Sequence, residues 1–336
     1  QLMSPVSISF ALFVAIGLAA YYAFPKSLRW TVLLALSLIF YASGGAYLLL
    51  YLAFTGFTTY AAGLLIEREL KSEKLSDEAK KRAKSRKKAI TGVCLILNFG
   101  LLFVLKYACP ILTSFGMGDF SIALPLGISF YIFQSASYVI DVGRRKAVCQ
   151  RNFAKYLLFV CFFPQMIQGP IGRYDALSEQ LLGGNGFNFD NFREGFKLIT
   201  RGLFKKLVIA DRASVAACAV IDSYTDFGGA EIAVGVLFYC IQLYTDFSGG
   251  IDIMRGTARL FGVVMAENFR RPLFANTLTD FWRRWHITLG AWMKDYLFYP
   301  ITLSKPFGAL GRFTRKYFKG RAGKILPTSA ATFLIY

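Results

Sequence analysis

Long stretches without a charged residue constrain this chain more than any other feature of its sequence. Residues 30–66 form an uncharged run of 37, and residues 2–24 form another of 23. A helix needs about 20 mainly apolar residues to cross a bilayer. The longer run therefore predicts two spans joined by a turn at the Ser-Gly-Gly of residues 43–45. The shorter run lacks a basic leader and a small-residue cleavage site, so we interpret it as a retained span.

Composition supports the same class of protein. Hydrophobic residues make up 55% of the chain and aromatic residues 16%, and the mean hydropathy is +0.45. We predict an all-α fold, a polytopic integral membrane protein with re-entrant and interfacial helices. The six cysteines are far apart and form no CxxC pair, which indicates neither a metal site nor a disulfide framework.

The basic residues lie in the loops between apolar runs. The net charge is +19, but cytoplasmic loops of membrane proteins carry such an excess of Lys and Arg, so the charge does not call for a nucleic-acid partner. Lys26 and Arg29 follow the first run, which predicts that the N-terminus lies outside. Residues 67–88 hold ten Lys or Arg against five Asp or Glu and predict a charged, partly helical cytoplasmic loop.

We expect residues 1–336 to form one membrane-embedded domain. Its first three spans would occupy residues 1–66, the charged loop residues 67–88, and the core region residues 89–336. Within that core region, residues 89–105 would lead outward and residues 121–140 would return to the cytoplasmic side. The apolar run that begins near Ile325 has only 12 residues before the last position, so we expect the domain to continue beyond Tyr336.

Residues 156–174 are apolar but contain Pro164, Gly169, Pro170 and Gly172. Proline and glycine at this density free backbone groups, which at membrane depth is tolerated only where protein or a wet cavity satisfies them. The pattern favours a re-entrant segment, and a kinked helix that faces lipid is the alternative.

A basic amphipathic segment follows at residues 192–207. One helical face would carry apolar side chains, and another would carry Arg193, Lys197, Arg201 and Lys205. This pattern is typical of a helix on the inner leaflet with its cations near anionic head groups, and equally of a docking face for an acidic partner.

Residues 207–221 would then cross outward, and residues 232–247 would return. The run after this return places Asp246 and Asp252 beside two glycines. Carboxylates at membrane depth usually mark a cavity or a pair. The alternative is that such an aspartate caps a helix or pairs with Arg255 or Arg259.

His286 is the only histidine in the chain, and it lies in the run TDFWRRWHITLGAWMKDYLFYP (279–300). Asp280 could cap a helix there, and it could pair with Arg284 four residues on. Three- and four-residue steps would then place four side chains on one inward helical face: Trp282, His286, Leu289 and Met293. A structural role and a catalytic or substrate-binding role for His286 stay equally open on these residues alone.

Basic residues flank the histidine segment on both sides. Arg270 and Arg271 precede it, and residues 305–324 follow it with seven Lys or Arg and no acid. Both flanks would therefore be cytoplasmic. Residues 281–303 would enter the bilayer and return, which places His286 in a pocket open to the cytoplasm.

Five blocks of the sequence resemble the membrane-bound O-acyltransferase family, in particular its bacterial branch that acts in alginate O-acetylation and, more distantly, teichoic acid D-alanylation. The blocks are PLGISFYIFQSASYVIDV (125–142), FFPQMIQGPIGRY (162–174), RGLFKKLVIADR (201–212), QLYTDFSGGIDIMRGTARLFG (242–262) and NFRRPLFANTLTDFWRRWHITLGAWMKDYLFYP (268–300). They cover most of residues 125–300.

The resemblance implies a multi-pass enzyme of the bacterial cytoplasmic membrane with helices around a central conduit. It would move an acyl group, here an acetyl group, from a cytoplasmic thioester to a hydroxyl of an exported cell-envelope polysaccharide or to an extracellular partner acyltransferase. The donor would be acetyl-CoA or an acyl carrier protein, used as a substrate and not as a bound cofactor. Membrane lipids would surround the protein.

The resemblance also implies roles for particular residues. His286 matches the first of two family histidines, and we expect the second, in a Trp-His pair, just beyond Tyr336. The second would be the base, while His286 positions or polarises the thioester carbonyl. Asp246, Trp282, Arg284 and Trp285 are candidate substrate-binding residues, and no metal is expected.

Other functions remain open at this point. D-alanyl transfer from a carrier-protein thioester to teichoic acid uses the same chemistry. A transporter or flippase would also use broken helices and intramembrane carboxylates, although the sequence shows no internal hydropathy repeat. A scaffold that recruits an extracellular acyltransferase is the third alternative.

Overall fold

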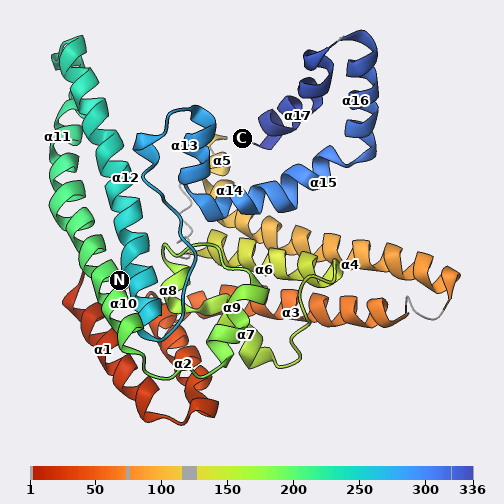
Figure 1. Cartoon of the computed structure of the whole chain (residues 1–336), viewed down its shortest axis with the longest axis horizontal. Coiled ribbons are helices and arrows are strands. Elements are labelled where there is room, and N and C mark those ends of the chain that lie inside the picture. Colours follow the sequence, from red (N-terminus) through yellow and green to blue (C-terminus); the bar gives the residue numbers. More distant parts are fainter. Residues whose placement is uncertain (1–2, 73–75, 116–126, 319, 336) are drawn as a thin grey trace. The chain divides into compact units, whose positions relative to one another are not determined.

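The computed structural model describes residues 3–72, 76–115, 127–318 and 320–335. Every regular element in these ranges is a helix, which confirms the all-α prediction (Figure 1). The chain folds into two compact units, Gln1–Ala266 and Glu267–Tyr336. The expectation of a single domain over residues 1–336 stays a prediction.

Three of the described helices are long and apolar enough to cross a membrane: Leu48–Ser72, Asp77–Ala108 and Gly229–Leu260. The helix of the first predicted span, α1 (Ile8–Ala23), is shorter, and residue 2 lies outside the described ranges. The long uncharged run folds into α2 (Arg29–Ala42) and α3 (Leu48–Ser72). Residues 43–47 separate them, so the predicted turn is confirmed.

The charged loop is mostly helical. Helix α3 extends into the loop and ends at Ser72. Helix α4 (Asp77–Phe103) begins after its N-cap, Ser76, and contains residues 77–88 of the loop. An ion pair of 3.6 Å between Arg86 and Glu69 joins the two helices. Helix α4 continues through a π-helical turn into α5 (Cys109–Ser114). The predicted return segment, residues 121–140, contains most of α6 (Ile128–Gly143). Residues 121–126 of that prediction lie outside the described part of the chain.

The proline- and glycine-rich segment lies inside the first unit. It contains the end of α7 (Phe153–Cys161), the short α8 (Phe163–Met166) and the start of α9 (Tyr174–Leu182). Residues 158–166 are all buried. Because protein surrounds this segment, the alternative of a kinked lipid-facing helix is wrong. Its re-entrant course through the membrane stays a prediction.

Side chains from two neighbouring helices and from the segment itself satisfy its backbone. The amide of Phe163 donates to the hydroxyl of Ser37 at 3.1 Å. The Gln134 side-chain amide donates to the carbonyl of Phe159 at 2.6 Å, and that of Gln165 donates to the carbonyl of Pro170 at 3.1 Å. These bonds meet the requirement that buried backbone groups find partners.

A long hairpin forms the last part of the first unit (Figure 1). One arm contains α10 (Phe189–Leu203), a π-helical stretch Phe204–Ala210 and α11 (Asp211–Ile221). The other arm is α12 (Gly229–Leu260). The predicted turn between outward and returning segments is therefore confirmed, although α12 is much longer than residues 232–247.

Two glycine pairs hold the arms of this hairpin together. A Cβ added to Gly195 would lie 2.9 Å from the carbonyl oxygen of Gly256, and one added to Gly202 would lie 2.5 Å from that of Gly249. Contacts this close leave no room for a side chain, so the two helix backbones touch at both points. We call these two pairs the glycine seam.

The second unit contains the histidine segment. Its elements are a 3-10 turn Pro272–Phe274, α13 (Leu278–Arg284), α14 (Ile287–Met293), a π-helical turn Lys294–Phe298, α15 (Tyr299–Thr302), α16 (Lys305–Tyr317) and α17 (Arg321–Ile335). The Thr314 hydroxyl, which donates to the carbonyl of Gly323 at 2.9 Å, ties α16 to α17.

Candidate active site

The helix predicted across His286 is broken at that residue. Helix α13 ends at Arg284, Trp285 is extended, and α14 begins at Ile287. His286 itself has φ 45° and ψ 51°, the left-handed conformation that residues other than glycine rarely adopt. The prediction that Trp282, His286, Leu289 and Met293 share one continuous helical face is therefore wrong.

The segment that precedes the helices explains this break. The amide of Arg270 donates to the carbonyl of Arg284, and the amide of Ile287 donates to the carbonyl of Asn268, both at 3.0 Å. The Asn268 side-chain oxygen accepts from the amide and the hydroxyl of Thr288, at 3.0 and 2.9 Å. A left-handed residue costs about 1–3 kcal/mol, and these four bonds offset that cost.

The start of α13 differs from the prediction in one residue. Thr277, and not Asp280, is the N-cap, because its hydroxyl accepts from the Asp280 amide at 3.1 Å. Asp280 lies in the first turn and pairs with Arg284 at 2.8 Å, which confirms the predicted ion pair. The hydrogen bond from Arg284 holds the pKa of Asp280 below its usual value. This pair fixes the candidate residue Arg284 two positions before the histidine.

Aromatic side chains surround the break within the second unit. Trp285 meets Phe269 edge to face, with ring centroids 4.9 Å apart, and stacks on Phe281 at 5.5 Å. The His286 ring lies 6.3 Å from that of Phe269. His286 is partly buried and lies outside the three candidate spans. This burial lowers the pKa of His286 to about 4, so its imidazole is neutral at pH 7.

A pocket of about 760 Å³ lies beside the break, entirely within the second unit. It is lined by Thr279, Trp282, Arg283, Ile287, Gly290, Ala291, Met293, Lys294, Phe298, Thr332 and Ile335. Most of its wall is apolar, and Arg283 and Lys294 bring two cations to it. A mainly apolar pocket of this size with a few polar groups suits a small-molecule ligand. Of the predicted binding residues, Trp282 belongs to its lining.

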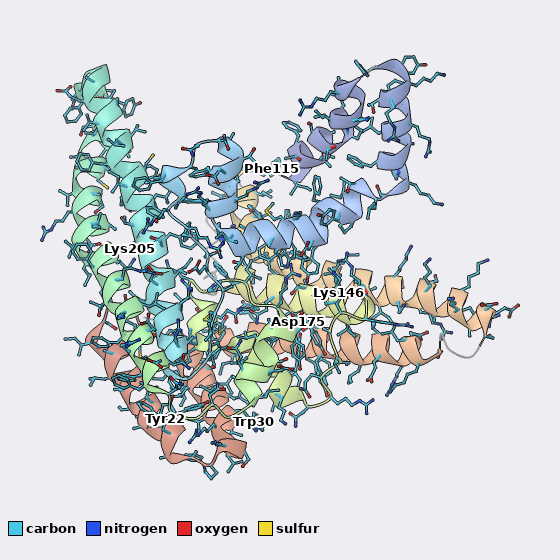
Figure 2. The ribbon with its side chains drawn as sticks, in the orientation of Figure 1. Tyr22, Trp30, Phe115, Lys146, Asp175 and Lys205 are labelled. Carbon is cyan, nitrogen blue, oxygen red and sulfur yellow. The ribbon has the colours of Figure 1, made fainter. Side chains whose placement is uncertain are left out.

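Asp246, the remaining candidate, belongs to the first unit. It lies on α12 and forms a short ion pair with Lys206 of the opposite arm. Asp252, six residues further along, pairs with Arg201 at 3.0 Å and Lys205 at 2.7 Å; Figure 2 labels Lys205 on this hairpin.

Both carboxylates, Asp246 and Asp252, are therefore members of ion pairs. Asp252 also pairs with Arg255 at 3.7 Å, as one alternative predicted. Arg201 and Lys205, predicted to face lipid head groups or a partner, instead contact Asp252. The described residues contain no cluster of three or more His, Cys, Asp or Glu side chains that could hold a metal ion.

Sequence reasoning missed Asn268 as a residue of this site, because an asparagine in a polar stretch carries no special signal. It also missed Lys206, although a signal existed. Basic residues on one helix and two carboxylates on the next stand on either side of a predicted turn, which predicts pairing across a hairpin.

The sequence of this chain is similar to those of known proteins. A probable alginate O-acetylase of Pseudomonas putida is 36% identical over 87% of this chain and 59% of its own length. A peptidoglycan O-acetyltransferase of Helicobacter pylori is 34% identical over 62% of this chain and 45% of its own length. A teichoic acid D-alanyltransferase of Bacillus subtilis is 28% identical over 52% of this chain and 44% of its own length.

The chain thus spans less than two thirds of the length of these relatives. A model of the membrane-bound O-acyltransferase family matches residues 36–314, which include parts of both units and the whole histidine segment. The chain belongs to the membrane-bound O-acyltransferase family.

Proposed function

We propose that this protein is a membrane O-acyltransferase that moves an acetyl group from a cytoplasmic thioester to a hydroxyl of an exported cell-envelope polysaccharide or of a partner transferase. The observation that carries the proposal is the family match across the segment that contains His286. The relatives that match at 34–36% identity are named for O-acetyl transfer, which favours acetyl as the group.

The reaction requires few parts. The acceptor hydroxyl attacks the thioester carbonyl carbon, the C–S bond breaks, and the thiolate leaves with the proton that the hydroxyl gave up. Donors that stabilise the oxyanion and a base that removes the proton both accelerate this step. A neutral imidazole has one N–H donor and one acceptor nitrogen. The low pKa of His286 thus suits it to polarise the carbonyl by donating a hydrogen bond.

The pocket beside α14 supports the donor side of the proposal. Its apolar wall fits an acyl chain and a pantetheine arm, and Arg283 and Lys294 fit the anionic groups that acetyl-CoA or a carrier-protein prosthetic group would bring. Trp282 lines this pocket, while Arg284 and Trp285 lie at the break. We assign these three residues to substrate binding. Asp246 takes a separate role in the first unit, where its ion pair with Lys206 stabilises the hairpin.

The proposed topology follows from the charges. The N-terminus would lie outside, and the flanks of the histidine segment, Arg270 and Lys316, would lie on the cytoplasmic side. Cysteine substitutions at these two positions should react from the same side of inverted vesicles. Reaction from opposite sides would remove the cytoplasmic access that the donor needs.

The principal test is the turnover of His286→Gln. We expect acetyl transfer from acetyl-CoA or an acetylated carrier protein to fall at least about 100-fold, because a lost oxyanion donor has that effect. As a control for folding, purified His286→Gln protein should elute from size-exclusion chromatography and unfold on heating as the parent protein does. Turnover within a fewfold of the parent would assign His286 a structural role. If the parent protein transfers D-alanyl but not acetyl groups, the function is D-alanyl transfer. If it transfers neither group, a transporter or a scaffold is favoured.

A further inference from the structure

Asn268 is the most enclosed polar residue at the histidine break. Its exposed fraction is 1%, and it lies 18 positions before His286 in the chain. Its backbone carbonyl accepts from Ile287, the residue directly after the histidine. Its side-chain oxygen accepts twice from Thr288. Three hydrogen bonds therefore join this one residue to the two positions that follow His286.

The orientation of the Asn268 amide is fixed by its partners. A backbone N–H such as that of Thr288 can only donate, so the atom that faces it is the oxygen Oδ1 and not the nitrogen. The nitrogen Nδ2 is buried and has no hydrogen-bond partner within the described ranges of the chain. A buried donor without an acceptor is unfavourable. The oxygen atoms of Asn268 must therefore account for its presence at the break.

The alternative to this arrangement is a continuous helix. The Trp285 amide already donates to Phe281 four residues earlier; without the bonds to Asn268, the amides of residues 286–288 could do the same, and His286 would leave its left-handed conformation. That change of more than 100° in φ would turn the imidazole to another direction. The bonds from Asn268 thus select between two directions of the same ring.

We propose that Asn268 is a positioning residue that holds the His286 imidazole in its working direction through hydrogen bonds to Ile287 and Thr288. The proposal rests on the proposed acyl transfer, because it names what keeps that reaction's histidine in place. It assigns Asn268 no contact with substrate. The effect of a positioning residue is large, since a displacement of about 1 Å can cost about 100-fold in rate.

The first measurement is the exposure of the ring to a reagent. Diethyl pyrocarbonate modifies neutral imidazoles, and mass spectrometry of the peptide that carries His286 gives its rate in the full-length protein. In Asn268→Ala we expect this rate to rise at least about fivefold, since the ring leaves its half-buried position. Asn268→Asp keeps an acceptor oxygen for Thr288, so we expect it to restore the rate to within about threefold of the parent.

The second measurement is turnover. Asn268→Ala should lower kcat about 100-fold and leave KM within about threefold, because the imidazole turns away from the carbonyl while the pocket residues Trp282 and Arg283 of α13, which ends before the break, keep their contacts. Asn268→Asp should recover most of kcat. Asn276→Ala, an exposed asparagine of the same unit, is the matched control and should change neither quantity.

Two further variants keep the test decisive if Asn268→Ala does not fold. Thr288→Val removes the bond between the Thr288 hydroxyl and Asn268 and keeps the bond from the Thr288 amide, so we expect His286 to react about twofold faster. Thr302→Val removes a hydroxyl that donates to the carbonyl of Phe298, outside the break, and should leave the rate unchanged. Equal rates in these two variants, or an unchanged rate in folded Asn268→Ala, would overturn the positioning role.

The labelling result also separates this proposal from the proposed function. If His286→Gln keeps its turnover, the acyl-transfer role of His286 fails. The labelling of the Asn268 variants still measures whether Asn268 sets the direction of the ring.

Discussion

Two breaks in apolar helices, one at residues 162–173 and one at residues 285–286, differ in their cause. The first contains two prolines and two glycines and is buried in the first unit. The second contains neither residue type, is partly exposed, and lies in the second unit. Local chemistry favours the first break, because a proline inside a helix removes one hydrogen bond and clashes with the preceding turn. Hydrogen bonds that Asn268 accepts and that Arg270 donates make the second break, so distant residues decide it.

The first break is thus set by its own residues, whereas the second depends on hydrogen bonds to other parts of the chain. At the first, side chains such as Ser37 satisfy a backbone whose path is already set by proline. At the second, the sequence could form a helix, and tertiary bonds hold it in a left-handed corner. A break of the second kind stores conformational strain at the residue we assign to chemistry, as functional sites often do.

The largest expected effect comes from placing a methyl group in the first break and another in α14, the helix that follows the second break. A Cβ on Gly169 would lie 2.4 Å from the Gln165 Cα and 2.7 Å from the Pro164 carbonyl oxygen, whereas a Cβ on Gly290 meets nothing within 4 Å. Gly169→Ala should therefore destabilise the protein by about 3 kcal/mol. Gly290→Ala should stabilise it by about 0.5–1 kcal/mol, since alanine favours helix. Thermal unfolding in detergent measures both; equal midpoints would show that the first break is not tightly packed.

A smaller effect should appear in the pH dependence of His286. Burial places its pKa near 4, against about 6.5 for an exposed histidine. The folded state therefore binds the proton less well than the unfolded state, so stability is unaffected above about pH 6.5 and falls as the pH drops from there toward 4. Between pH 7.5 and 5.5, diethyl pyrocarbonate should modify His286 at nearly constant rate. A tenfold decrease over that interval would mean an ordinary, exposed histidine.

The smallest expected effect concerns the left-handed corner itself. Asparagine tolerates this conformation better than glutamine does. We therefore expect His286→Asn to be more stable than His286→Gln by about 0.5–1 kcal/mol, with both inactive. At Met293, inside α14, the same pair of substitutions should show the opposite order, because glutamine is the better helix former. Equal stability of the two His286 variants would argue against a strained corner.

Much of the fold could be predicted because its causes are local. The turn at residues 43–47, the hairpin of α10 to α12 and the break near Pro164 all follow from uncharged length, glycine and proline. The pair of Asp280 and Arg284 follows from helical spacing. Each of these features depends on residues close together in the chain.

The rest depended on residues that are distant in sequence. Nothing in TDFWRRWHITLG indicates a break, because the bonds that cause it come from Asn268 and Arg270. In the same way, the sequence around Arg201 and Lys205 resembles a membrane-binding surface. Only the structure shows that both cations pair with Asp252 on the facing arm. Periodicity identified these side chains but not their partners.

The glycine seam has a consequence for how the hairpin finds its alignment. Its pairs are seven residues apart on each arm, so the arms could slide by one such step and still bring one glycine against another. Either slide would set Asp246 opposite Ile199 or Ala213 in place of Lys206. A carboxylate facing an apolar side chain is strongly disfavoured. The glycines thus allow the two helices to approach closely in more than one alignment. The ion pair of Asp246 with Lys206 favours the one that is observed.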